Sequence, residues 1–190
     1  MQNNIDILYE AAKFFHDNLE GKQFHLIAGK RGNLLEFDIV FNAKHFKHLI
    51  GFHKLYDIPM SDRSSEVIYH QILDKKTDYS DIENSCYIKE MEDRLKVFNR
   101  IKDLLFSPNV MLKSSKGFFR TIRADFLLSK TDDLLGNIHL FLKGDKEGIV
   151  FPVSYFTDNT NAFFVLGYAK WKVLSVREIV KVEDKDDNKK

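Results

Sequence analysis

The segment 41–54, Phe-Asn-Ala-Lys-His-Phe-Lys-His-Leu-Ile-Gly-Phe-His-Lys, gathers side chains that can move protons and hold positive charge. It contains no acidic residue, although the whole chain has a net charge of only +1. Imidazole titrates near neutral pH and can give or take a proton there, while ammonium groups attract phosphate. The segment therefore predicts a local phosphate-handling surface. Its titratable residues are His45, His48, His53, Lys44, Lys47 and Lys54.

The composition limits the classes of protein to which the chain can belong. A length of 190 residues suggests one domain, and 44% hydrophobic residues with 17 Phe favour a substantial core rich in strands. The near-zero net charge argues against coating nucleic acid by bulk charge, so any such contact must be local. The single cysteine, Cys86, excludes an internal disulfide and a multi-cysteine metal site.

Neither a membrane segment nor an export signal is indicated by the sequence. The N-terminus lacks a basic region followed by an apolar core. No apolar run approaches the ~18 residues needed to span a bilayer. We therefore expect a cytoplasmic protein that makes no membrane contact.

Hydrophobic periodicity predicts the elements that must position the histidine-rich segment. Apolar residues at three- and four-residue spacing predict a helix over 4–19, and alternation predicts strands over 23–28 and 34–41 joined by a turn at 29–33. Asn42 can cap a short helix that Gly51 ends. On that helix the apolar residues can dock on a sheet, with Lys44 and His48 facing outward together. The docking residues are Phe46, Leu49 and Ile50.

The rest of the chain predicts a helical insert followed by strands. The insert spans about 57–106, with helices at 65–73 and 86–106, the second ended by Pro108. Pro152 favours an edge position or a bulge in one late strand, and the charged tail 183–190 is expected to be disordered. The expected late strands are 118–129, 137–142 and 149–156, then a strand pair or strand and helix over 162–168 and 171–182.

These elements predict an α+β fold, an antiparallel β-sheet of four or more strands with helices packed on one side. We expect one domain over residues 1–182 that includes the helical insert. The insert is too short for independent folding, and its apolar faces need a partner.

Several short motifs resemble the phage and mobile-element class of the Barnase–EndoU–colicin–RelE ribonuclease superfamily. The run 24–55 carries a strand, a Gly-Lys-Arg-Gly turn, a second strand and then Phe46-x-His48-Leu49-x-Gly51. The segment 138–156 is similar to the closing strands, and 123–128, Arg-Ala-Asp-Phe-Leu-Leu, also fits. The resemblance covers most of residues 20–180.

The resemblance implies a helix backed by a four-stranded antiparallel sheet and metal-independent cleavage of RNA. Catalytic residues differ between branches of the superfamily, so only matching positions carry over. These positions are His48, Ser154 and Tyr155.

Metal-free RNA cleavage needs a base for the 2′-hydroxyl proton, an acid for the leaving 5′-oxygen, and cations around the transition state. We expect His48 as the acid or base; the alternative is a polar cap or a hydrogen bonder at the core edge. Arg120 lies on the apolar parity of its predicted strand, so it either snorkels from the strand end or points into a polar cleft. In a regular strand only one of Ser154 and Tyr155 can face the cleft, and Ser154 is the first choice.

A second group of residues is expected to bind the substrate, and each has an alternative role. Arg123 could pair with an acid across the sheet, and Lys44 and Lys47 on the helix could form a solvated face. His45, like His53, could be an interior histidine with satisfied hydrogen bonds. The predicted substrate-binding residues are Lys44, Lys47, His45, Arg123 and Lys30.

Other chemistries fit the sequence less well. Gly29-Lys30-Arg31-Gly32 lacks the spacing and the Ser or Thr of a P-loop. His45 and His48 have a spacing that zinc accepts, but no acidic ligand is adjacent and the lysines would repel a cation. We expect no metal and no cofactor.

Two functions of different classes remain open. The first is a toxin-like endoribonuclease that acts on RNA, such as tRNA or ribosome-bound mRNA, with an antitoxin or immunity protein as partner. The alternative is a catalytically inactive RNA-binding or protein-interaction module of a mobile element. The helices of 57–106 could also form a homodimer or antitoxin-docking face.

Overall fold

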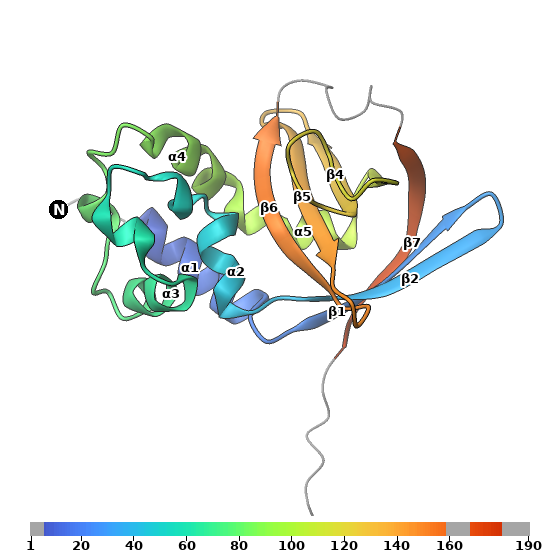
Figure 1. Ribbon diagram of the computed structural model, residues 1–190, viewed down its shortest axis with the longest axis horizontal. Coiled ribbons are helices and arrows are strands. Elements are labelled where there is room, and N and C mark those ends of the chain that lie inside the picture. Colours follow the sequence, from blue (N-terminus) through green and yellow to red (C-terminus); the bar gives the residue numbers. More distant parts are fainter. Residues whose placement is uncertain (1–5, 159–167, 180–190) are drawn as a thin grey trace, which may run out of the picture.

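The helices before residue 98 gather at one end of the molecule and the strands at the other, and the last helix, 101–106, lies beside the strands (Figure 1). The computed structural model describes residues 6–158 and 168–179. The α-helices are α1 (Ile7–Asn18), α2 (Ala43–Leu49), α3 (Ser65–Leu73), α4 (Ile88–Val97) and α5 (Ile101–Phe106). Short 3₁₀ helices are η1 (Phe52–Lys54), η2 (Pro59–Asp62), η3 (Tyr79–Asp81) and η4 (Phe98–Arg100). The strands are β1 (Gln23–Lys30), β2 (Asn33–Val40), β3 (Val110–Lys113), β4 (Phe126–Asp132), β5 (Gly136–Gly144), β6 (Val150–Asp158) and β7 (Ala169–Ile179).

The strands form a closed barrel in the order β1-β2-β6-β5-β4-β3-β7. Neighbouring strands are antiparallel except β2 and β6, which pair in parallel at Ile39 and Val150. The mixed α+β class and the mostly antiparallel sheet are as expected. The expectation of a sheet with helices packed on one side needs correction, because β7 pairs with both β1 and β3 and the sheet curls into a barrel.

The first hairpin has a tighter turn than the sequence suggested. Arg31 and Gly32 have φ angles of 49° and 82°, and Lys30 pairs directly with Asn33. Two central residues with positive φ are the pattern of a type I′ turn, whose twist matches that of paired strands. The loop therefore contains two residues instead of five, and both strands are longer than predicted.

The short helix α2 forms where the sequence placed it. It follows Asn42 and ends before Gly51, which has a φ of 82°. Phe46 and Leu49 of α2 and Ile50, which follows it, are fully buried, so one face of α2 is fixed in the core. The other face is left to carry polar side chains.

The insert begins as predicted and then departs from one long helix. Helix α3 has the predicted bounds, and the Ser64 hydroxyl accepts a hydrogen bond from the Val67 N–H. The predicted helix 86–106 is interrupted by η4. The Val97 carbonyl accepts a hydrogen bond of 2.6 Å from the Tyr155 hydroxyl, and Phe98 is buried beside Phe46 and Tyr155. The predicted helix is therefore interrupted where the insert packs against β6.

The predicted strand 118–129 was wrong over most of its length. The sequence analysis missed β3, and residues 114–125 form a loop between β3 and β4. Within this β3–β4 loop, Phe119 and Ile122 bond each other's backbone across a turn, and Arg120 has a φ of 56°. Phe119 and Ala124 pack into a small second core, which explains why the loop carries a strand-like apolar pattern.

The end of the chain is described only in part. Strand β7 corresponds to the predicted element 171–182 and shows it to be a strand. Most of the predicted strand 162–168 and the tail 183–190 lie outside the described residues. No helix within 6–158 or 168–179 combines the length and apolarity required to cross a membrane.

Replacing Gly51 with Ala should destabilise the protein more than the same change at Gly32. Both glycines have a φ of 82°, which costs an L-residue ~1–2 kcal/mol. A Cβ at Gly51 would also lie 2.9 Å from Cδ of the buried Arg94, whereas a Cβ at Gly32 meets no atom within 4 Å. We expect urea unfolding to show a loss of about 3 kcal/mol for Gly51→Ala and about 1 kcal/mol for Gly32→Ala. Equal losses would contradict the packing of Arg94 against Gly51.

Candidate active site

A cavity of about 470 Å³ opens where α2, β5, β6 and the β3–β4 loop meet. We call it the histidine pocket. Two of its lining residues come from α2, two from the loop, one from β5 and three from β6. They are His45, His48, Ile122, Arg123, Lys143, Phe151, Pro152 and Val153.

Contact between α2 and the barrel builds one wall of this pocket. The rings of His45 and Phe151 are stacked, with centroids 5.6 Å apart and planes at 5°. Lys143 lies opposite Phe151 in the β5–β6 pairing, so its side chain is brought to the same place. This stacking contact is one of those that join α2 to the strand pair that supplies a cation.

The backbone of Asn42 fixes the protonation state of His45. The Asn42 N–H donates to His45 Nδ1 at 3.0 Å, so the ring proton must reside on Nε2. Burial, and secondarily Lys44, lowers the pKa of His45 to about 4. His45 is therefore a neutral hydrogen-bond donor near pH 7, and its Nδ1 is already occupied.

His48 is the imidazole best placed to exchange a proton with a ligand. It lies on the solvent side of α2 and lines the pocket. Partial burial, and then the charge of Lys47, lowers its pKa. A lowered pKa keeps the ring neutral at pH 7, and a neutral imidazole can accept a proton.

His53 lies behind His48, with ring centroids 4.5 Å apart. Burial first, then the charges of His48 and Arg94, lowers the pKa of His53 to about 4. Its buried Nδ1 has no hydrogen-bond partner among the described residues. His53 thus backs His48 with a neutral ring and does not line the pocket.

Two cations complete the histidine pocket. Arg123 is exposed, and its guanidinium lies 5.7 Å from the centre of the Phe118 ring. Lys143 is half-buried at the end of β5. No Asp or Glu is among the described residues that line the pocket, so its charge is positive. Sequence reasoning found Arg123 and missed Lys143, which only the β5–β6 register connects to Phe151.

Three predicted substrate-binding lysines do not line this pocket. Lys44 is exposed on α2, and Lys30 lies at the tip of the β1–β2 hairpin. Lys47 is 7% exposed and donates to the Arg63 carbonyl at 2.6 Å. Burial lowers the pKa of Lys47. Its role in this structure is to tie α2 to the segment before α3.

Three predicted catalytic residues are also placed elsewhere. Arg120 lines a different cavity, described below. Tyr155 is fully buried, and its hydroxyl donates a hydrogen bond to the Val97 carbonyl. Of the two alternatives expected at Pro152, an edge position or a bulge, the structure has a bulge, since Pro152 pairs with Leu142 and Ser154 with Phe141. It is Val153, between them, that lines the pocket in place of Ser154 or Tyr155.

Across residues 6–158 and 168–179, no three or more His, Cys, Asp or Glu side chains gather as metal ligands. Lys143 and Arg123 line the same pocket as His45 and His48, and their positive charge opposes binding of a cation there.

Comparison with known proteins relates the chain to a nuclease family. A family model described as phage-Barnase-EndoU-ColicinE5/D-RelE like nuclease4 matches residues 7–188. No curated protein and no solved structure matches the chain.

Replacing His45 with Gln should reduce the loss of stability in acid. His45 has a pKa of about 4 when folded and about 6.5 when unfolded, so the unfolded state takes up its proton first as the pH falls below 6.5. The free energy of unfolding therefore falls between pH 6.5 and 4. Gln can still accept from Asn42 but does not titrate, so we expect urea unfolding at pH 7 and 4.5 to show a drop about 2 kcal/mol smaller than in the parent chain. An unchanged drop would contradict a neutral, buried His45.

Proposed function

The chain belongs to the phage-Barnase-EndoU-ColicinE5/D-RelE like nuclease4 family, and on that basis we propose that it is a metal-independent endoribonuclease. The observation that carries this proposal is the convergence of two neutral imidazoles and two cations in the histidine pocket. The imidazoles are His45 and His48, and the cations are Arg123 and Lys143. A phosphodiester needs this combination of proton transfer and positive charge for cleavage by its own 2′-hydroxyl.

His48 acts as the general base in this proposal. Its neutral ring takes the proton of the 2′-hydroxyl, and the 2′-oxygen then attacks phosphorus. His45 is less suited to this step because its Nδ1 already accepts the Asn42 N–H. Its Nε2–H instead donates a hydrogen bond to a phosphate oxygen.

Arg123 and Lys143 stabilise the negative charge that builds up on phosphate. Arginine can hold two phosphate oxygens at once, and it does not lose its proton in proteins. A lysine ammonium can release a proton, so we assign to Lys143 the protonation of the leaving 5′-oxygen. The P–O5′ bond breaks, and the products are a 2′,3′-cyclic phosphate and a 5′-hydroxyl.

The biological setting follows from the same proposal. A toxin-like nuclease would meet tRNA or ribosome-bound mRNA in the cytoplasm, and a cognate antitoxin would have to cover or distort the histidine pocket. An antitoxin with acidic side chains would match the charge of Arg123 and Lys143. The alternative, a module that binds RNA without cutting it, would keep the cations and lack proton transfer.

His48→Ala should abolish most RNA cleavage. Loss of a general base typically lowers a rate by about 10²- to 10⁴-fold. We expect purified protein to cleave total RNA in EDTA, with 2′,3′-cyclic phosphate ends, and His48→Ala to lose this activity while retaining the fold. His70→Ala, which removes an exposed histidine on α3, is the matched control. RNA retention without cleavage by the parent chain would support the inactive module instead.

The pH dependence of cleavage should report the base. Because the pKa of His48 lies below its ordinary value of about 6.5, the neutral base persists as the pH falls to 6.5 and is lost only below it. We expect the acid limb of kcat/KM to have its midpoint below pH 6.5. Lys47→Gln removes one of the two causes of the lowered pKa and should move the midpoint upward. A midpoint above 6.5 in the parent chain would contradict His48 as a base with a lowered pKa.

A further inference from the structure

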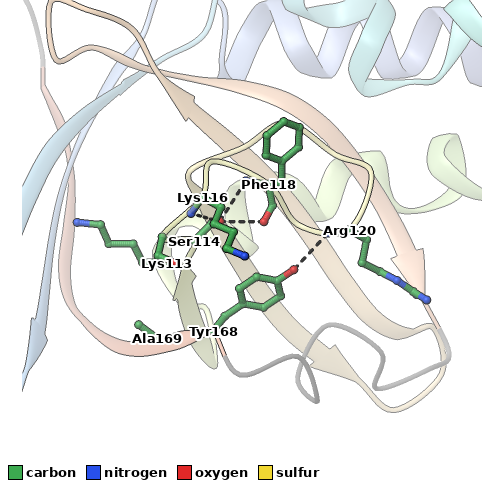
Figure 2. A pocket seen from close by; sticks show the side chains of 8 residues that line it. Lys113, Ser114, Lys116, Phe118, Arg120, Tyr168 and Ala169 are labelled. Carbon is green, nitrogen blue, oxygen red and sulfur yellow. Dashed lines mark hydrogen bonds between the residues drawn. The ribbon is translucent and has the colours of Figure 1, made fainter.

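A second cavity, of about 700 Å³, is also lined in part by the β3–β4 loop (Figure 2). We call it the loop pocket. It is bordered by β3, the loop and the start of β7, and its described lining contains three cations, two aromatic rings and no acid. The lining residues are Lys113, Ser114, Ser115, Lys116, Phe118, Arg120, Tyr168 and Ala169.

One buried hydroxyl makes three of the hydrogen bonds that fix the shape of the loop. Ser114 is 7% exposed, and its Oγ donates to the Phe118 carbonyl at 2.8 Å. The same oxygen accepts from the N–H groups of Lys116 and Phe118 at 3.2 and 3.1 Å (Figure 2). The loop is therefore held in place before any ligand arrives, which lowers the entropic cost of binding.

The aromatic rings of the loop pocket are held but remain accessible. Phe118 is 43% exposed, so part of its ring is accessible to a ligand. Tyr168 packs on Phe119 with centroids 4.5 Å apart, and its hydroxyl accepts from the Arg120 N–H at 3.2 Å. In Figure 2 the side chains of Lys113 and Arg120 point away from the Tyr168 ring in opposite directions. The Lys113 ammonium lies 5.9 Å from the centre of the Trp171 ring.

One side-chain contact within the β3–β4 loop connects the loop pocket with the histidine pocket. Phe118 lines the first and Arg123 lines the second, and the Arg123 guanidinium lies 5.7 Å from the centre of the Phe118 ring. A strand that places a phosphate beside Arg123 can thus continue over Phe118. The charge is positive on both sides of this contact.

We propose that the loop pocket binds an unpaired nucleotide of the RNA strand next to the bond cleaved in the histidine pocket. Aromatic faces bordered by lysine and arginine are the means by which proteins bind single strands, since every base can stack and every linkage carries a phosphate. A duplex would keep its bases stacked on each other and could not use Phe118 in this way. The inference rests on the proposed function and adds to it a preference for single-stranded RNA.

The test is binding of a fluorescein-labelled, 2′-O-methyl mixed-sequence decamer, which cannot be cleaved by 2′-hydroxyl attack, measured by anisotropy on the full chain. Each lost phosphate contact reduces the slope of log K against log[salt] by ~0.7. We expect Lys113→Ala/Lys116→Ala to weaken binding about tenfold and to reduce the slope by about 1.4. Lys76→Ala/Lys89→Ala removes the same charge from exposed sites near the helices and should change neither quantity beyond the general effect of net charge.

Two variants of Phe118 test the contribution of its aromatic ring to binding. Phe118→Leu keeps an apolar side chain and removes the ring, and we expect about tenfold weaker binding. Phe118→Tyr keeps the ring and should restore affinity. Mixed mononucleoside monophosphates should compete only at far higher concentration than the unlabelled decamer; tighter binding of the free nucleotides would contradict a site for an RNA strand.

The outcomes separate this inference from the proposed function. Cleavage of RNA with decamer binding that is equal in the Lys113/Lys116 and control variants would overturn the loop pocket as a subsite and leave the nuclease intact. Decamer binding that depends on Lys113, Lys116 and the Phe118 ring, without any cleavage, would support the subsite and contradict the nuclease. A double-stranded 2′-O-methyl probe that binds as tightly as the single strand would also overturn the inference.

Discussion

The stack of His45 on Phe151 is the contact on which the proposed site depends. It attaches the polar face of α2 to β6, at the point where Lys143 lies across the β5–β6 pairing. The apolar face of α2 is anchored separately in the core through Phe46, so the helix has little freedom to move its histidines. Two packed faces on a helix of seven residues explain how so short an element can hold a site.

The electrostatics of the site follow from partial burial without acids. Burial lowers the pKa of each imidazole around His48, and neighbouring cations lower it further. A carboxylate in the pocket would have the opposite effect and would also compete with phosphate for Arg123. A positive pocket with neutral histidines therefore favours an anionic ligand and keeps a base available at neutral pH.

Local signals in the sequence predicted the local parts of this arrangement. The cap at Asn42, the stop at Gly51 and the apolar spacing of α2 were sufficient to place His48 on a solvent-facing surface, and the family resemblance is confirmed by the match over residues 7–188. The alternation of apolar and polar residues over 118–129 wrongly predicted a strand. Phe119 and Ala124 are buried within a loop, whose backbone is hydrogen-bonded by the Ser114 hydroxyl. An apolar pattern reports burial, and it identifies a strand only when backbone pairing follows.

No local pattern in the sequence predicted the contacts between distant segments. Closure of the barrel through β7, the position of Lys143 beside Phe151 and the burial of Tyr155 beneath Val97 all depend on register between distant segments. Neither Ser154 nor Tyr155 lines the histidine pocket, because the bulge in β6 brings Val153 to that position instead. A sequence predicts which strands exist more readily than which of their side chains meet.

The central claim is that a phosphodiester lies in the histidine pocket, and NMR of the histidine rings tests it most directly. The full chain would be titrated with the uncleavable 2′-O-methyl decamer while the Cε1–H resonances of the imidazoles are followed. The account predicts that the resonances of His45 and His48 shift together and in proportion to binding, while those of His16 on α1 and His70 on α3 stay in place. Binding of the decamer with His45 and His48 unmoved would contradict it.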